Sequence, residues 1–450
     1  MFNKRRSKPR EYLEVIVCLV MIGASAFPII VPLFDTGRSV FFYPIEIIAT
    51  VSLIVYAFGT RRHSIEGDNG SRSSKDIALL VALSAIALAT VQSIFRGFDP
   101  RLWTYARVVI VTMAALAFLS LNAEGQASKA ASIMTALTTI NALQLYYFRL
   151  GAFRHSTILG NVAVYGCLVA TVYPFLYSAL ISPSSLLVRI AAGFNVATSC
   201  FLLPYTGSRI SLLVMVGVIV LTTVAINSHN LAPNRAVIVL IIIAFGVSYV
   251  YSFTLASTFD AKAFQRATLT EHLGESPNSG EGNGSRINME SESDRGSTAN
   301  PDEEPPPLTV STETTEASDR LRFAMWRKGM DLIREYPIVG SGLLTFPVQI
   351  SGKLQEQSLH NAVLEVLVNY GLPIGLAYIY ALYHLYRASL LKQSKARRRI
   401  TLISLVAFFI SSMFQPLMVN YIMIVFITLL LGLREDLAFP NKSGKIIWAQ

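Results

Sequence analysis

Charged residues are scarce in this 450-residue chain: they make up 15% of the sequence, against 52% for hydrophobic residues, and the mean hydropathy is +0.48. An ordinary soluble domain has about 25% charged residues, so the shortage excludes that class. Apolar runs of about 20 residues, each long enough to cross a hydrocarbon core of about 30 Å, recur along nearly the whole length. The composition therefore predicts a polytopic membrane protein.

Cysteine is also rare, and Cys18, Cys167 and Cys200 all stand in apolar segments. An odd number without metal-ligand spacing indicates neither a disulfide framework nor a zinc site. We interpret the three as small buried hydrophobic residues. Because the segments expected outside the membrane hold no Asp-x-Asp motif and no cluster of His and carboxylate residues, we also expect no metal and no cofactor.

The excess of basic over acidic residues, 38 against 28, gives a net charge of +10. These residues are scattered over short loops beside hydrophobic spans, so they do not indicate a basic face that binds nucleic acid. Most of them fall in segments that share one side of the membrane, such as KRRSKPR near the N-terminus and KQSKARRR in a late loop. By the positive-inside rule, both termini are predicted to be cytoplasmic.

The predicted fold is an all-α polytopic membrane protein with about twelve spanning helices, N-in and C-in. The expected spans are 11–33, 40–59, 77–95, 101–121, 128–149, 161–181, 186–204, 208–226, 236–254, 361–386, 400–417 and 419–433. A cleavable signal peptide is the alternative for the first span, but its apolar stretch continues through FPIIVPLF. We expect residues 1–254 to hold nine spans, residues 255–358 one long periplasmic loop, and residues 359–450 three spans and a cytoplasmic tail.

The long loop has two parts. Residues 271–319 are rich in Ser, Gly, Pro and acids and low in apolar residues, which predicts disorder. Residues 320–336 have apolar residues at helical spacing and stop at Tyr336-Pro337, which predicts an amphipathic helix. This helix could pack on the outer ends of the bundle or lie flat on the membrane surface.

Three polar features are expected at the outer mouth. The first is Gly207-Ser208-Arg209 at the start of a span, where free backbone N–H groups and a guanidinium could bind an anion; alternatively, Arg209 reaches lipid headgroups. The second is the pair Arg320 and Arg322 in the amphipathic helix, although arginines there are commonly just solvated.

The third feature is His360-Asn361, directly before a hydrophobic helix that carries Glu365. A His in this position is commonly a cap or an interface residue, and Asn361 fits a helix cap. Glu365 could support His360 or an arginine, or it could make a structural hydrogen bond between helices. Taken together, the three features suggest one site that places a base beside an anion.

In this order and placement, the motifs resemble the O-antigen ligase and polymerase family of bacterial membrane proteins. The resemblance rests on TGSRISLL, on Arg322 and Trp326 followed by EYPIVGSG, and on HNAVLE with two glycines after it. The twelve-span plan and the long loop agree with it. The segment RHSTILGN is similar to the family's outer Arg…Gly-Asn loop, but Val162 and Ala163 stand where Pro-Asn is usual, and the acidic insert is unusual as well.

The resemblance implies metal-independent, inverting transfer of a glycan from an undecaprenyl-diphosphate carrier to an acceptor hydroxyl, on the periplasmic face of the bacterial inner membrane. The expected partners are that donor, a glycan or lipid A-core acceptor, and membrane lipids. A ligase is favoured; a repeat-unit polymerase of the same family and a twelve-helix secondary transporter are the alternatives. The implied roles are His360 as general base, Arg209, Arg322, Arg320 and Ser208 as diphosphate ligands, and Arg154, Asn361 and Glu365 as glycan-binding or supporting residues.

Overall fold

The computed structural model describes residues 8–32, 39–59, 69–96, 100–121, 126–151, 159, 162–181, 186–226, 232–254, 308–310, 315–342, 346–350, 353–415, 417 and 420–433. These ranges hold 13 α-helices, which confirms the predicted helical class. The helices are α1 (Lys8–Ala26), α2 (Pro44–Gly59), α3 (Asn69–Arg96), α4 (Pro100–Ala115), α5 (Gln126–Arg149), α6 (Val162–Ile181), α7 (Leu186–Leu202), α8 (Arg209–Ile226), α9 (Ala232–Thr254), α12 (Thr315–Glu335), α13 (Ala362–Leu391), α14 (Lys395–Ser412) and α15 (Tyr421–Leu431). A π-helical turn, Leu116–Ser120, continues α4, and a 3-10 turn, Leu203–Thr206, follows α7.

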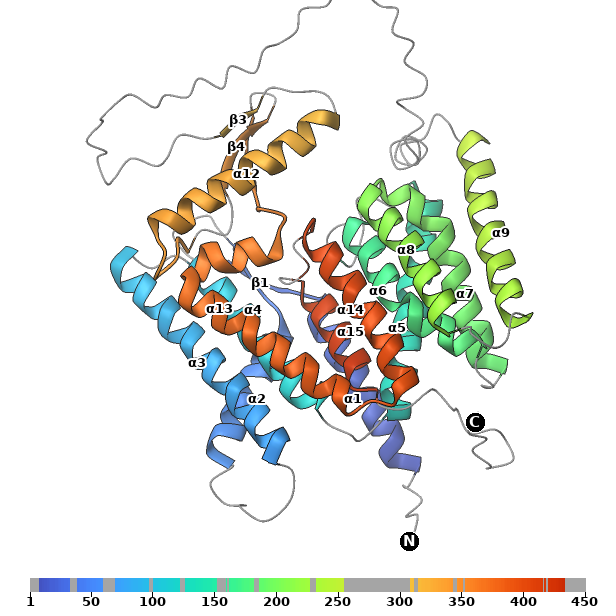
Figure 1. Ribbon diagram of the computed structural model, residues 1–450, viewed down its shortest axis with the longest axis horizontal. Helices are drawn as coiled ribbons and strands as arrows, with labels where there is room; N and C mark the ends of the chain where they lie inside the picture. Colours follow the sequence, from blue (N-terminus) through green and yellow to red (C-terminus); the bar gives the residue numbers. More distant parts are fainter. Residues whose placement is uncertain are drawn as a thin grey trace, which may run out of the picture.

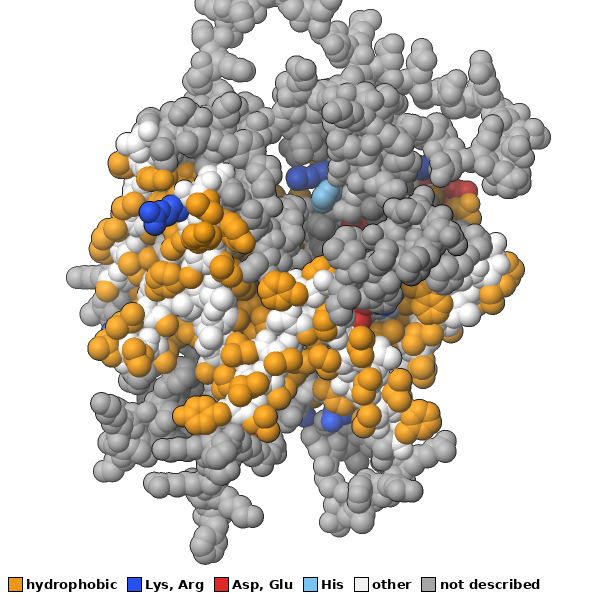
Figure 2. All heavy atoms as spheres, turned by 180° about the vertical axis from the view of Figure 1, so that it is seen from behind, with side chains coloured by type: hydrophobic (Ala, Val, Ile, Leu, Met, Phe, Trp, Pro, Cys, Tyr) orange, Lys and Arg blue, Asp and Glu red, His pale blue; other side chains and the backbone are white. Residues whose placement is uncertain are grey.

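Within the described ranges, five helical stretches are long and apolar enough to cross a membrane, by length and composition. They are Ser74–Phe95, Trp103–Ser120, Val162–Ile181, Leu186–Thr206 and Ala362–Leu391. Shorter apolar helices accompany them, and hydrophobic side chains cover most of the described surface in Figure 2. This surface suits a protein in contact with lipid, while the total of twelve spans and their orientation stay predictions.

The first two helices differ from their predicted bounds. α1 ends at Ala26, because the residue before Pro28 disfavours helical backbone, and Ile29–Pro32 forms strand β1. β1 pairs antiparallel with β2 (Ser39–Phe42), and α2 then begins at Pro44, where a proline suits the first helical turn. β1 and all of β2 except Ser39 occupy residues that we had expected inside spans 11–33 and 40–59.

The long-loop region is ordered over more of its length than predicted. β3 (Leu308–Val310) pairs in parallel with β4 (Phe346–Ile350), which pairs antiparallel with β5 (Lys353–Gln357). β3 and the start of α12 at Thr315 both fall inside residues 271–319, where we expected disorder. Residues 255–307 lie outside the described part of the chain.

The centre of the bundle is formed by α6, whose side chains are buried from Val162 to Ala179, and by α15, which is buried throughout. α6 packs against α7, α8 and α14, as Figure 1 shows. The three cysteines are buried, as predicted.

Several helix starts meet at one end of the bundle. Arg107 of α4 forms an ion pair with Glu46 of α2 at 3.1 Å, and Tyr421 of α15 donates to Glu46 at 2.7 Å. Tyr105 of α4 donates to Glu365 near the start of α13 at 3.1 Å. Because α12 packs against α13 at this same end, we call it the α12 end (Figure 1).

Candidate functional site

His360 has an unusual backbone at the α12 end. It lies between β5 and α13 with φ of 52°, and among the described residues it is the only one other than glycine with positive φ. Side chains other than glycine adopt this region rarely, and such strain clusters at functional sites. The imidazole is partly buried, and no hydrogen-bond partner is seen for its Nδ1 in the described part of the structure.

His360 stands directly before a short half-helix. Asn361 is the N-cap of α13, since its side chain accepts a hydrogen bond from the Leu364 N–H at 3.1 Å. The helix is not continuous: Gly371 has φ of 70° and ψ of 172°, which separates residues 362–370 from the rest of α13. The span that we expected over 361–386 is therefore broken just beyond Glu365.

The break in α13 is filled by the turn that follows α12. The Ser341 N–H donates to the Val368 carbonyl at 2.7 Å, and the Leu372 N–H donates to the Pro337 carbonyl at 2.8 Å. Gly340 also has positive φ, 73°, and a Cβ there would collide with the backbone of residue 369. The EYPIVGSG segment thus fixes the half-helix through direct backbone contact.

Gln92 of α3 strengthens this junction. Its buried side-chain amide donates to the carbonyl of Val339 at 2.7 Å and to the carbonyl of Asn369 at 2.9 Å. One side chain therefore joins three separate segments: α3, the turn after α12, and the half-helix. Because all three elements are fixed together, the half-helix is a rigid support for His360.

α12 covers the outer side of the half-helix. Met325 and Leu332 form a buried cluster with residues of the half-helix and with Leu359. Trp326 donates from its indole N–H to the Leu359 carbonyl at 2.8 Å, next to His360. This packing places the predicted amphipathic helix on the bundle, which was the first of the two placements that we considered.

Arg322, one turn before Trp326, lies near His360. Burial lowers the pKa of His360 below 6.5, and the positive charge of Arg322 lowers it further. His360 is therefore neutral at pH 7, the state that a general base requires. The fold thus brings Arg322 of α12 near His360, although the two residues are far apart in the chain.

Glu365 is buried directly behind His360, with 2% of its surface exposed. Its carboxyl group accepts a hydrogen bond from the Tyr105 hydroxyl at 3.1 Å and lies near the Ser358 side chain and the His360 backbone. The hydrogen bond to Tyr105 is the structural bond between helices that we considered, while support of His360 by Glu365 stays a prediction. A buried carboxylate needs such partners, because leaving it without them would cost several kcal/mol.

Ser208 and Arg209 stand at the start of α8, as predicted. The Ser208 hydroxyl accepts from the Ser211 N–H at 3.2 Å, so Ser208 caps the helix. Arg209 is the first helical residue and is partly buried. Its place in one site with His360 and Arg322 stays a prediction, as does diphosphate binding by Ser208.

Two predicted site residues lie outside what the structure describes. Arg154 falls in 152–158, and although Arg320 belongs to α12, its side chain is not among the described ones. Within the described ranges, no group of three or more His, Cys, Asp or Glu side chains could hold a metal ion. Transfer without a metal likewise stays a prediction.

Sequence reasoning missed the polar groups of α2, α3 and α4 at this end. Glu46 and Arg107 both lie in predicted spans, and an ionisable residue there usually has a partner and a function, which was an available signal. Gln92 and Tyr105 carried no such signal, because each becomes informative only when its partner on α13 is known.

Comparison with known proteins gives one family. Residues 194–380 match the family model described as O-antigen ligase, and these residues include α8, α12, the half-helix and His360. No curated protein matches the chain.

Proposed function

We propose that this chain, which carries an O-antigen ligase family domain over residues 194–380, transfers a glycan from undecaprenyl diphosphate to an acceptor hydroxyl at the periplasmic surface. The observation that supports the proposal is that neutral His360, directly before the rigid half-helix, lies near the permanent charge of Arg322 on α12. A base and an anion-binding group side by side are what glycosyl transfer from a diphosphate requires.

In the proposed reaction, the acceptor oxygen attacks the anomeric carbon opposite the diphosphate, so the configuration inverts. The C–O bond to the diphosphate breaks as the new C–O bond forms, and the acceptor proton passes to His360. Negative charge builds on the leaving diphosphate, where planar guanidinium groups can hold its oxygens bidentately. Arg322 serves this role, with Arg209 and Arg320 as its proposed partners.

Glu365 and Asn361 act indirectly. Asn361 begins the half-helix through its cap, and Glu365, which lies near the His360 backbone and Ser358, supports the loop before it. Arg154 is proposed to contact the glycan. No metal takes part in the proposed mechanism, because the arginines neutralise the leaving group.

The test is complementation of strains that lack either a ligase or a polymerase, with the glycan ladder examined on a gel. Wild-type protein should restore the ladder in one of the strains, and His360→Ala, Arg209→Ala and Arg322→Ala should each abolish it at normal protein levels. Accumulated full-length lipid-linked chains would indicate a ligase, which we favour, and single repeats would indicate a polymerase. Normal ladders in all three variants would refute the proposed site.

A further inference from the structure

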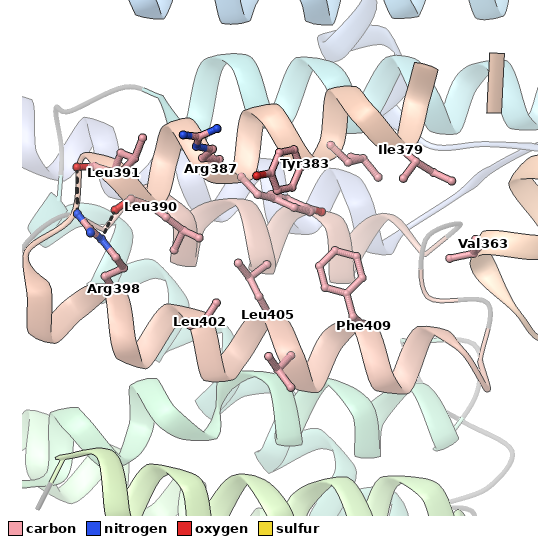
Figure 3. A pocket seen from close by; sticks show the side chains of 13 residues that line it. Val363, Ile379, Tyr383, Arg387, Leu390, Leu391, Arg398, Leu402, Leu405 and Phe409 are labelled. Atoms are coloured by element: carbon pink, nitrogen blue, oxygen red, sulfur yellow. Dashed lines mark hydrogen bonds between the residues drawn. The ribbon is translucent and has the colours of Figure 1, made fainter. Parts of the chain in front are cut away.

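A groove runs between α13 and α14, with a cavity volume of about 460 Å³ (Figure 3). Except for two arginines, its lining consists of aliphatic and aromatic side chains, among them Leu382 and Tyr386 of α13 and Leu405 of α14. Tyr383 and Leu402 on its walls are each at least half exposed, so the groove is open along its side. In a membrane, an opening of this kind faces hydrocarbon chains and not water.

The charges of the groove lie at one of its ends. Figure 3 shows Arg387 of α13 and Arg398 of α14 at the end beside the turn that joins the two helices, and Val363 at the opposite end. Arg398 donates from Nε to the Leu390 carbonyl at 2.9 Å and from Nη2 to the Leu391 carbonyl at 3.3 Å, which closes the turn. Arg387 is exposed, and within the part of the chain that the structure describes its guanidinium makes no hydrogen bond or ion pair. The Arg387 guanidinium is therefore available to a ligand at this end of the groove.

The turn around these arginines is strongly basic. From residue 387 to residue 399 the sequence has no acidic residue and six basic ones, Arg387, Lys392, Lys395, Arg397, Arg398 and Arg399. No Asp or Glu occurs anywhere from residue 366 to residue 434. The turn follows the end of α13 that is remote from α12, and the predicted topology places it on the cytoplasmic side (Figure 1). A basic surface at the edge of a membrane attracts anionic lipid headgroups.

The apolar wall that starts at the arginines has about the length of one leaflet. On α14 it runs from Arg398 to Phe409, about eleven residues or roughly 16 Å at about 1.5 Å per residue. Half of a hydrocarbon core of about 30 Å is about 15 Å. An acyl chain whose headgroup lies at the arginine end would therefore follow this wall and end near Phe409.

We propose that this groove binds one anionic glycerophospholipid of the adjoining leaflet, with its phosphate on Arg387 beside Arg398 and one acyl chain between α13 and α14. A guanidinium binds phosphate oxygens bidentately, and the groove supplies the apolar surface that the chain needs. A lipid diphosphate donor does not fit this charge distribution, because its diphosphate belongs at His360 and the nearest end of the groove, at Val363, has no charged lining residue. The bound phospholipid holds α13 and α14 together at the end opposite the candidate site, and its binding does not depend on glycan transfer.

The test uses full-length protein in nanodiscs of phosphatidylcholine that contain a small fraction of phosphatidylglycerol with a diazirine at the end of one acyl chain. After irradiation, mass spectrometry should locate the label around Ile379 and Phe409, where the chain is expected to end. Phosphatidylcholine with the same diazirine chain should label these positions at least about fivefold less, because its headgroup has no net charge and one basic residue near anionic headgroups contributes about that factor. Equal labelling by the two lipids would overturn the proposal.

Arg387→Gln tests the contribution of the charge. It should reduce labelling by phosphatidylglycerol about fivefold and leave labelling by phosphatidylcholine unchanged. Arg189→Gln is the matched control, since Arg189 is an exposed arginine of α7 outside the groove, and it should label like wild type. Equal labelling of the two variants by phosphatidylglycerol would show that Arg387 does not hold the lipid.

Leu402→Trp tests the groove itself. It narrows the groove at an exposed position, so it should reduce labelling by phosphatidylglycerol, whereas Leu213→Trp, at an exposed leucine of α8 outside the groove, should label like wild type. Labelling that falls mainly on other helices would overturn the proposal. So would a polyprenyl diphosphate with a diazirine chain that labels the groove more strongly than phosphatidylglycerol does, because the donor would then be its occupant.

Thermal unfolding provides an independent measurement. A ligand that binds only the folded protein stabilises it, so phosphatidylglycerol in place of phosphatidylcholine should raise the unfolding temperature of wild type and of Arg189→Gln. The increase should be smaller for Arg387→Gln, and an equal increase in both variants would contradict the proposed site. Neither measurement needs a donor or an acceptor, so the lipid site is tested separately from the proposed function.

Discussion

The guanidinium of Arg322 lies near the imidazole of His360, and its positive charge adds to the larger effect of burial in holding the pKa of His360 below 6.5. Repulsion between the two favours neutral imidazole, so the residue that we propose for binding the leaving group also keeps the proposed base neutral. This coupling has a consequence for the pH dependence of transfer.

Activity should be lost as pH falls through the pKa of His360, because a protonated imidazole cannot accept a proton. For wild type, the acid limb of kcat/KM should therefore have its midpoint below 6.5. Arg322→Gln removes the repulsion but not the burial, so the midpoint should move to higher pH. The rate at the optimum should also fall by about 10²–10³-fold from the lost charge contact.

Arg327→Gln is the control for this shift. It removes the same charge from an exposed position of α12, so it should leave the midpoint where it is in wild type. Equal midpoints in wild type and Arg322→Gln would show that Arg322 does not act on His360.

Tyr105→Phe tests whether Glu365 supports the loop of His360. The change removes the hydroxyl that donates to Glu365 and keeps the ring, whose edge packs against Tyr370. We expect a loss of about 1–3 kcal/mol in stability, since a buried carboxylate loses a partner, and a lower kcat with little change in KM. Thermal unfolding in detergent and initial rates measure the two effects.

Tyr370→Phe is the matched control. Its hydroxyl is buried with no hydrogen-bond partner seen in the described structure, so its removal should be neutral or stabilising. If both variants behave alike, the Tyr105–Glu365 hydrogen bond has no supporting role.

The sequence was sufficient to predict the helical membrane class and most of the helices, because runs of about 20 apolar residues are a strong local signal. It also predicted the cap at Asn361 and the amphipathic helix, since both depend on local pattern. The break in α13 was not predicted, although Gly371 and Pro373 were visible, because both residues also occur in continuous spanning helices.

The candidate site could be predicted only in part. His360 and Arg322 carry chemistry that is evident from their types, whereas Gln92 and Tyr105 matter because of segments far away in the chain. Gln92 and Asn369, for example, are 277 residues apart. Strand β3 escaped prediction for the same reason, because its partner β4 is distant in the chain: Leu308 pairs with Val348.

Gln92→Leu should weaken the support of the half-helix. The substitution leaves the carbonyls of Val339 and Asn369 without their donor. Each lost partner should lower the free energy of unfolding by about 1–3 kcal/mol. We expect a lower unfolding temperature and slower transfer. Thr90→Val on the same helix is the control. The exposed Thr90 hydroxyl donates only to the Ile86 carbonyl of its own helix, so removing it should change the unfolding temperature and the transfer rate little. A Gln92→Leu protein as stable and active as Thr90→Val would contradict the role given to Gln92.

Gly371→Ala and Gly340→Ala should damage the site more than a change at any other described glycine, because each of the two lies against the backbone of the other's segment. Both have positive φ, and a Cβ on Gly371 would collide with the carbonyl of residue 338, while one on Gly340 would meet residue 369. Neither contact can be relieved by a flexible side chain, so the turn must separate from the half-helix. We expect loss of transfer together with increased proteolysis of the 336–342 turn.

Gly217→Ala supplies the comparison. Gly217 lies within α8, and a methyl group added to its Cα would meet no other atom within 4 Å, so alanine there should stabilise the helix by roughly 0.5–1 kcal/mol through reduced chain entropy. Limited proteolysis of the three variants in nanodiscs, with transfer rates measured on the same samples, should distinguish Gly371→Ala and Gly340→Ala from the Gly217→Ala control. If Gly371→Ala kept both the wild-type cleavage pattern and the wild-type rate, the half-helix would not depend on backbone contact with the turn, and the rigid placement of His360 would need another explanation.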